Sequence, residues 1–150
     1  VLFRSAGVKA MFPTVVPMVK TLDLDFVDLT EEEAVMRLPD QKPYHNHIGG
    51  PHAGAMFTLA ESASGALVLA NFGDQMEKAT PLAVSAQIRY LAVAMGDVTA
   101  QARMTRTAAD VLAELDEGKR PEFAVEIDLI AGEKTTGQMT VVWTLKPNKS

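Results

Sequence analysis

The chain has 150 residues, 47% of them hydrophobic and 22% charged, and a formal net charge of −5. This length fits one domain with one core, and the acidic balance argues against nucleic acid as the main partner. The absence of cysteine excludes thiol catalysis, disulfides and thiolate metal sites, and it fits a reducing compartment such as the cytoplasm. We therefore expect a single cytoplasmic domain over residues 1–150.

The chain opens with a segment that we interpret as an N-terminal extension of this domain, residues 1–19. Its start, Val1–Ser5, has no initiator methionine and is interpreted as a truncation or cloning remnant. Two segments with period-two alternation of apolar and polar residues follow, at 22–26 and 34–38. This period is typical of a strand with one solvated face, and Pro39 stops the second strand.

A glycine-containing loop over residues 43–51 precedes the longest apolar segment, residues 53–72. Apolar residues cover most of its helical circumference, so the predicted helix must be enclosed on most sides. Its length reaches the roughly 20 residues that a membrane span needs. However, Glu61 lies near its middle, and a central charge is costly in lipid. We therefore expect a buried helix that ends at Gly73-Asp74 and does not span a membrane.

Four further alternating segments predict four more strands, and each is expected to bury one apolar row. The polar stretch 110–120 between the second and third of them predicts a short helix or a lid. The order is thus two strands, one helix and four strands, which predicts an α+β fold with a curved antiparallel sheet wrapped around the helix. The expected buried rows are Leu82–Val84–Ala86–Ile88–Tyr90, Val98–Ala100–Ala102–Met104, Phe123–Val125–Ile127–Leu129 and Met139–Val141–Trp143–Leu145.

The loop and the first half of the helix carry a motif, which reads Asn-His-Ile-Gly-Gly-Pro-His-Ala-Gly-Ala-Met-Phe-Thr-Leu-Ala-Glu over residues 46–61. It resembles the active-site stretch of hotdog-fold acyl-CoA thioesterases, similar to those for phenylacetyl-CoA and 4-hydroxybenzoyl-CoA. In that family an Asn or Gln precedes a His-Gly-Gly at the helix start, and an acid follows on the helix. The resemblance covers roughly residues 22–145. It implies a hotdog fold and an enzyme that hydrolyses an acyl thioester to a free acid and a thiol.

The resemblance also implies catalytic roles. Glu61 is the only charged side chain in residues 53–71, and burial of such an acid raises its pKa. By resemblance it acts as general base or nucleophile. The backbone N–H groups of Ala53 and Gly54 would form the oxyanion hole at the helix start. Asn46 would hold the thioester carbonyl or a water, and His52 would shape the loop.

Two departures from the family pattern are visible. Ala53 replaces the first of the family's paired glycines, and Gly65 stands where relatives often carry a hydroxyl residue that positions water. Relatives also often have basic residues where Leu91-Ala92-Val93-Ala94 stands, which leaves room for a thioester carrier other than coenzyme A. The candidates for binding coenzyme A phosphates are Lys78, Arg89, Arg103 and Arg106.

The expected partners follow from the same resemblance. Coenzyme A would enter as part of the substrate, without a resident cofactor, and His47 and His52 lack the third ligand that a metal site needs. Ala53 and Glu61 are eight positions apart, or about 12 Å along a helix. One helix therefore cannot readily place both groups on one thioester, so we expect a homodimer with shared sites, or a dimer of dimers.

Other functions stay open. A dehydratase or hydratase of the same fold would use His47 and Glu61, whose spacing of fourteen positions is similar to that of the catalytic pair in acyl-carrier-protein dehydratases. An acyl-binding module without turnover is compatible with Gly65 and with the few basic residues on the strands. Glu61 could also be a structural acid that Asn46 or a histidine satisfies.

Overall fold

The computed structural model describes residues 2–149, with side chains from Ser5 onward. Val1, part of the expected remnant, lies outside the described residues. Two short 3-10 turns, Lys42–Tyr44 and Gly73–Gln75, flank the central helix. The other elements are α1 (Leu2–Val15), α2 (Pro17–Thr21), β1 (Asp25–Leu29), β2 (Glu33–Leu38), α3 (Ala53–Phe72), β3 (Ala79–Tyr90), β4 (Val98–Met104), α4 (Ala108–Asp116), β5 (Glu122–Ala131) and β6 (Lys134–Pro147).

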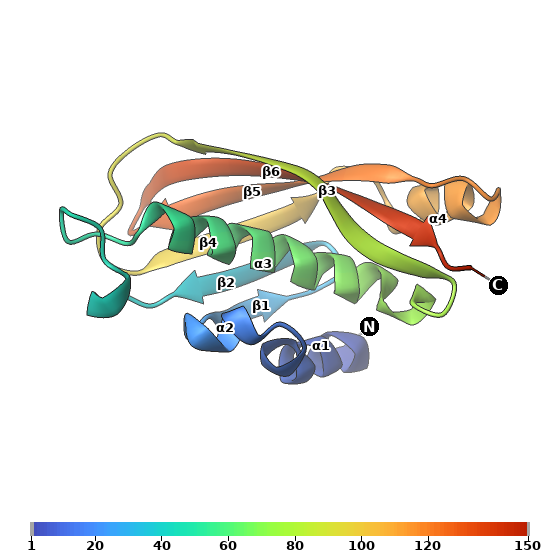
Figure 1. The fold of residues 1–150 in the computed structure, drawn as a ribbon, viewed down its shortest axis with the longest axis horizontal. Helices are drawn as coiled ribbons and strands as arrows, with labels where there is room; N and C mark the ends of the chain where they lie inside the picture. Colours follow the sequence, from blue (N-terminus) through green and yellow to red (C-terminus); the bar gives the residue numbers. More distant parts are fainter. Residues whose placement is uncertain (1, 150) are drawn as a thin grey trace.

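The six strands form one antiparallel sheet in the order β1-β2-β4-β5-β6-β3, and α3 lies along its concave face (Figure 1). The expected α+β hotdog fold is confirmed. Residues 53–75 are long and apolar enough to cross a membrane by composition. In the structure most of α3 is instead buried inside the domain, against β2, β4 and β5. The helix is therefore the centre of the core.

The first strand begins later than the alternation of residues 22–26 predicts. Leu22 directly follows α2 and caps it, since its N–H donates to the carbonyl of Met18. Asp23 then has a positive φ of 55°, which turns the chain. The strand starts only at Asp25. Leu22 and Leu24 are nevertheless buried, so the alternation identified core residues but placed the strand start too early.

The predicted buried row on β3 is wrong, whereas the other three rows are buried as expected apart from the half-buried Met104. Leu82, Val84 and Tyr90 are 40%, 48% and 48% exposed. β3 is an edge strand, and α3 packs mainly on other strands. The pairing with β6 also shifts at Val84, and such a bulge changes which face the following residues occupy. β3 thus leaves an apolar edge uncovered.

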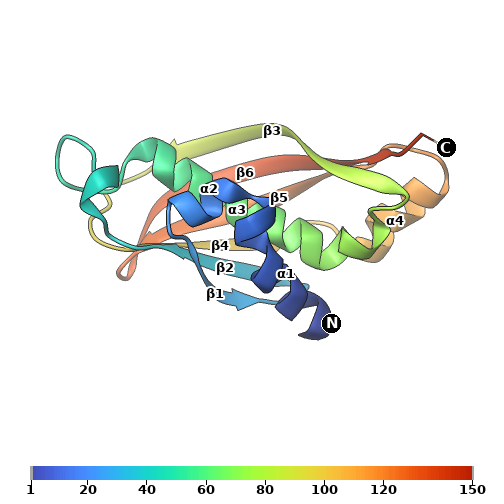
Figure 2. The same ribbon diagram turned by 60° about the horizontal axis from the view of Figure 1, so that its bottom comes forward.

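The N-terminal extension packs against the main fold. α1 and α2 lie across α3 on the side away from the sheet (Figure 2). Val8, Phe12 and Val19 are buried, and the ring of Phe12 meets that of Phe26 edge-on at 5.7 Å between centroids. α1 is therefore a wall of the core.

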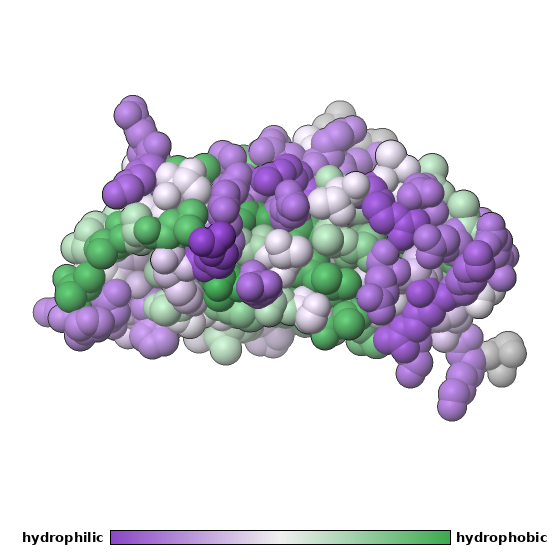
Figure 3. Space-filling model, turned by 90° about the horizontal axis from the view of Figure 1, so that it is seen from above, coloured by the Kyte–Doolittle hydropathy of each residue, from purple (hydrophilic) through white to green (hydrophobic). Residues whose placement is uncertain are grey.

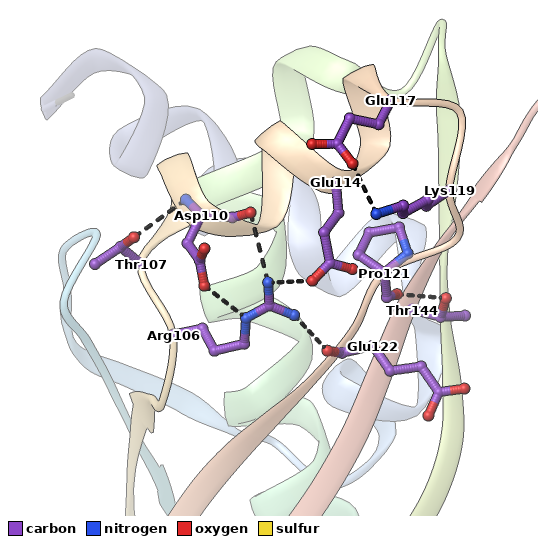
Figure 4. Close-up of polar contacts among 9 residues, drawn as sticks. All are labelled: Arg106, Thr107, Asp110, Glu114, Glu117, Lys119, Pro121, Glu122 and Thr144. Atoms are coloured by element: carbon purple, nitrogen blue, oxygen red, sulfur yellow. Dashed lines mark hydrogen bonds and ion pairs between the residues drawn. The ribbon is translucent and has the colours of Figure 1, made fainter.

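The polar stretch after β4 forms the expected short helix, α4, and one arginine holds it in place (Figure 4). The guanidinium of Arg106 donates to the carboxylates of Asp110 (2.9 Å) and Glu114 (2.6 Å) and to the carbonyl of Glu122 (2.8 Å). Thr107 caps the helix by accepting from the N–H of Asp110. The positive charge of Arg106 is therefore paired with the negative charges of Asp110 and Glu114.

Candidate active site

The loop before α3 is held in shape by Asn46. Its side-chain oxygen accepts from the N–H groups of Ile48 (3.0 Å) and Gly50 (3.1 Å), and its NH₂ group donates to the carbonyl of Pro51 (3.3 Å). An amide NH₂ carries two hydrogens, and among the described residues only one of them is used. Asn46 therefore builds the loop and leaves one of its amide hydrogens without an acceptor among the described residues.

Gly50 is the point where this loop meets the segment after β3. A Cβ at Gly50 would lie 2.4 Å from the carbonyl oxygen of Ala94, which is closer than any side chain allows. Only glycine lets the two backbones approach this far. The contact places the apolar segment Leu91–Ala94 beside the start of α3.

The start of α3 is capped by His52, whose Nδ1 accepts from the N–H of Gly54 at 2.8 Å. The Gly54 amide, expected as an oxyanion donor, is therefore occupied in this structure. The N–H of Ala53 has no acceptor among the described residues, as is usual for the first turn of a helix. The Tyr90 hydroxyl fixes this turn by donating to the Ala53 carbonyl at 2.9 Å.

A cavity of about 370 Å³ opens beside this helix start. Its rim is apolar and exposed: Ile48 and Leu91 are close to half exposed, and Val93 is 65% exposed. Figure 3 shows hydrophobic side chains gathered at this end of the molecule. The residues that line the cavity are Asn46, Ile48, Pro51, Ala53, Met56, Tyr90 and Leu91–Ala94.

Glu61 lies two turns further along α3, in a different and smaller cavity of about 190 Å³. The side chain is partly buried, and this desolvation raises the pKa of its carboxyl group. Among the described residues no side chain or N–H forms a hydrogen bond or ion pair with that carboxyl group. The other residues that line this cavity are Phe12, Val16, Gly65, Val68, Leu69, Met76, Thr80, Pro81 and Trp143.

Ser64, the hydroxyl residue next to Gly65, forms both of its hydrogen bonds within the protein. The Oγ–H of Ser64 donates to the carbonyl of Glu61 at 2.7 Å, and the same oxygen accepts from the indole N–H of Trp143 at 3.1 Å. Ser64 therefore fastens Trp143 to α3. At position 65 there is no side chain, and the indole ring lies against the open space.

Within the chain the expected catalytic residues line three separate spaces. Asn46 and Ala53 line the larger cavity, His52 and Gly54 line a neighbouring groove, and Glu61 lines the smaller cavity. His47 is exposed on the loop and lines none of these three spaces.

The candidate phosphate ligands have different surroundings. Arg106 is held in its α4 cluster, and Arg103 pairs with Glu126 and Asp128. Among the described residues, Lys78 and Arg89 form no ion pair. In residues 2–149, no group of three or more His, Asp or Glu side chains is placed to hold a metal ion.

Three residues of the two cavities escaped the sequence analysis. Phe12 lies in the N-terminal extension, to which no role in the site was assigned, and Trp143 was assigned only to the core. Tyr90 was expected to point into the core, but its hydroxyl fixes the helix start. For Tyr90 the sequence offered one signal: a tyrosine at the end of a strand carries a hydroxyl group that usually finds a hydrogen-bond partner.

Comparison with known proteins gives a family and a fold. A family model described as a domain of unknown function, DUF4442, matches residues 4–145. No curated protein matches the sequence significantly. Three similar solved structures come from Pseudomonas aeruginosa (described as a probable thioesterase of unknown function; 24% identity, TM-score 0.85), Shewanella oneidensis (provisionally named a thioesterase; 17%, 0.81) and Silicibacter pomeroyi (a thioesterase family protein; 17%, 0.74). The alignments cover 96%, 98% and 96% of this chain and 96%, 100% and 99% of the respective relatives.

Proposed function

The chain belongs to the DUF4442 family, and we propose that it is a thioesterase that hydrolyses an acyl thioester to a free acid and a thiol. The observation that carries this proposal is the Glu61 carboxyl group, which is partly buried beside apolar side chains and has no partner of its own. A structural acid in such a place is normally paired. The thioesterase names of the similar structures agree with this reading.

Glu61 would supply the basic group of the reaction. Its raised pKa makes it a stronger base near neutral pH than an ordinary carboxylate. It either removes a proton from the attacking water or attacks the thioester carbon itself. The developing oxyanion would be stabilised by the N–H of Ala53, at the positive end of the α3 dipole. Asn46 would orient the carbonyl with its remaining donor.

These groups come together if two β3 edges pair. The Glu61 cavity borders Thr80 and Pro81 at the start of β3, whereas the Ala53 cavity borders Tyr90 at its end. Antiparallel pairing of a strand with its own copy places the start of one beside the end of the other. The exposed apolar edge of β3 suits such pairing. Two sites would result, each with Glu61 from one protomer and Ala53 from the other.

Coenzyme A is the carrier that we propose. Of the four candidates, Lys78, next to the start of β3, and Arg89, towards its end, form no ion pair among the described residues and would contact its phosphates. Arg106 is less suited, because its donors are already used by α4.

A panel of acyl-CoA substrates followed by thiol release tests the activity. Thiol and free acid should appear in equal amounts. An unsaturated enoyl-CoA distinguishes a thioesterase from a hydratase. Hydration by His47 and Glu61 would consume the double bond and leave the thioester intact. Binding without either change would indicate an acyl-binding module and would contradict the proposal.

Mixed dimers test the shared site. Ala53→Pro removes the donor N–H at the first helical position, where proline is tolerated, and Glu61→Ala removes the acid. Equal co-refolding of the two inactive variants should restore roughly a quarter of wild-type activity, because half of the dimers then contain one intact site. Co-refolding Glu61→Ala with Glu61→Gln is the matched control and should stay inactive. Heterodimers of the first pair without activity would contradict shared sites.

A further inference from the structure

The cavity beside Glu61 has a roof that the N-terminal extension provides. Phe12 and Val16 come from α1 and the residue after it, while Gly65 and Val68 come from α3 and Trp143 from β6. Figure 2 shows α1 crossing α3. We propose that this cavity receives the acyl group, and that Phe12 and Gly65 set the largest acyl group that the protein accepts. The inference rests on the proposed thioester hydrolysis and specifies its substrate.

The floor of the cavity is fixed. The indole N–H of Trp143 is turned away from the cavity to Ser64, and Ser64 is in turn bonded to the α3 backbone. The ring therefore presents carbon atoms to the cavity and cannot swing aside without breaking its hydrogen bond to Ser64. A longer acyl chain would have to displace the roof instead.

The volume sets the size of the acyl group. An apolar cavity of about 150 Å³ accommodates a benzene ring, and this one measures about 190 Å³. In proportion, it holds an acyl tail of about seven or eight carbon atoms, whether linear or cyclic. Longer fatty chains would leave their ends in water or force α1 outward.

The lining sets the chemistry of the acyl group. Among the described residues that line the cavity, the polar groups besides Glu61 are the indole N–H of Trp143, which is bonded to Ser64, and the hydroxyl of Thr80, which donates to Asn148 at 2.7 Å. The described lining offers no free hydrogen-bond donor, so a further carbonyl group on the acyl chain would lose its hydration without a partner. A second carboxylate would also be repelled by Glu61. The substrate class is therefore thioesters of compact acids that carry no further carbonyl or anionic group.

Gly65 controls the width of the gap between Trp143 and Phe12, and Phe12 controls the height of the cavity. A Cβ at Gly65 would lie 3.6 Å from the Trp143 ring and 3.8 Å from that of Phe12. These are ordinary contacts, so alanine fits without strain and occupies space between roof and floor. A shorter side chain at position 12 would instead enlarge the cavity on the side of α1.

Binding of non-hydrolysable S-alkyl thioethers of coenzyme A, with chains of about four, eight and twelve carbons, measures the cavity independently of turnover. We expect wild-type protein to bind the octyl compound about tenfold more tightly than the dodecyl compound. Gly65→Ala should weaken octyl binding about tenfold and leave butyl binding within about twofold. Phe12→Leu should reduce the preference for octyl over dodecyl to about threefold or less, while retaining enough packing to fold.

Met11→Ala is the matched control, because Met11 lies on the same helix but is 43% exposed; it should bind all three compounds as the wild type does. Equal affinity for all chain lengths, or no effect of Gly65→Ala and Phe12→Leu in folded protein, would overturn the inference. Thiol release from the matching acyl-CoA esters separates the two proposals. Size-dependent binding without hydrolysis would remove only the proposed activity, and hydrolysis without size dependence only this inference.

Discussion

Glu61 on α3 and Glu114 on α4 are both partly buried carboxylates on helices, and their surroundings are opposite. Glu114 accepts from Arg106 at 2.6 Å, within a cluster in which Asp110 and a backbone carbonyl use the other donors (Figure 4). Glu61 faces apolar side chains and has no such partner in the described chain.

The difference separates two uses of a charge. The Arg106 cluster joins α4 to β5, so its carboxylates stabilise the fold as long as they stay ionised and paired. Glu61 gains nothing from its surroundings when ionised, and burial makes its charged form costly. An ionisable group that lowers the stability of the fold and forms no stabilising contact is a candidate for a catalytic role.

Glu61→Gln should lower thiol release about a hundredfold or more, because a positioned base contributes at least that much. The melting temperature at neutral pH should rise by a few degrees. Burial raises the folded-state pKa above the unfolded value, so ionisation of Glu61 costs stability as the pH rises through that interval. The gain should vanish in acid below the unfolded pKa. Retention of more than about a tenth of the activity, about 1.4 kcal/mol of barrier, would count against Glu61.

Arg106→Met should give the opposite result. The free energy of unfolding should fall by about 1–3 kcal/mol, because three charge-assisted hydrogen bonds are lost at a partly exposed site. Thiol release per folded molecule should stay unchanged. Urea unfolding measures the stability, and thiol release from the same sample measures the turnover. A loss of turnover as large as that of Glu61→Gln would contradict a purely structural role for Arg106.

Asn46→Ala should lower turnover less than Glu61→Gln, by about tenfold, because it removes one donor to the substrate. It also leaves two loop N–H groups without their acceptor. Asn46→Asp is the control, since it keeps the acceptor oxygen for the two loop N–H groups and replaces the NH₂ group, with its bond to Pro51, by a negatively charged oxygen. If the aspartate variant retains full activity, Asn46 shapes the loop and does not contact the substrate.

Lys78→Ala and Arg89→Ala should each raise the KM for an acyl-CoA by a factor of about two to five, with kcat unchanged, as expected for exposed charges. The effect should shrink in high salt. Arg106→Met should leave the KM unchanged, because its guanidinium faces α4. An effect of Arg106→Met larger than that of Arg89→Ala would place the phosphates at the α4 end.

The core was predictable from periodicity, and the exceptions have physical causes. Rows such as Phe123–Leu129 alternate strictly and are buried. The row on β3 alternates as well, but neither its position at the sheet edge nor the bulge at Val84 can be read from one strand. The start of β1 was misplaced because Asp23 adopts a positive φ, which aspartate does only in a suitable context.

The site was predictable only where its residues are close in sequence. Glu61 stood out as a lone charge, and the loop motif pointed to Asn46 and His52. The cavity walls contributed by Phe12 and Trp143 come from opposite ends of the chain, so no local pattern could bring them to Glu61. The occupation of the Gly54 amide by His52 also depends on a ring orientation that the sequence does not determine.

The most direct test of Glu61 as the reactive group needs no substitution. The rate of thiol release by the wild-type protein should be measured from about pH 8 to about pH 5, with circular dichroism in parallel to verify folding. Because burial raises the pKa of Glu61, its ionised form is lost earlier in acid than for an ordinary glutamate. We predict that kcat/KM falls about tenfold per pH unit below that pKa while the protein stays folded. A flat profile across this range in folded protein would contradict an ionised Glu61 as base or nucleophile.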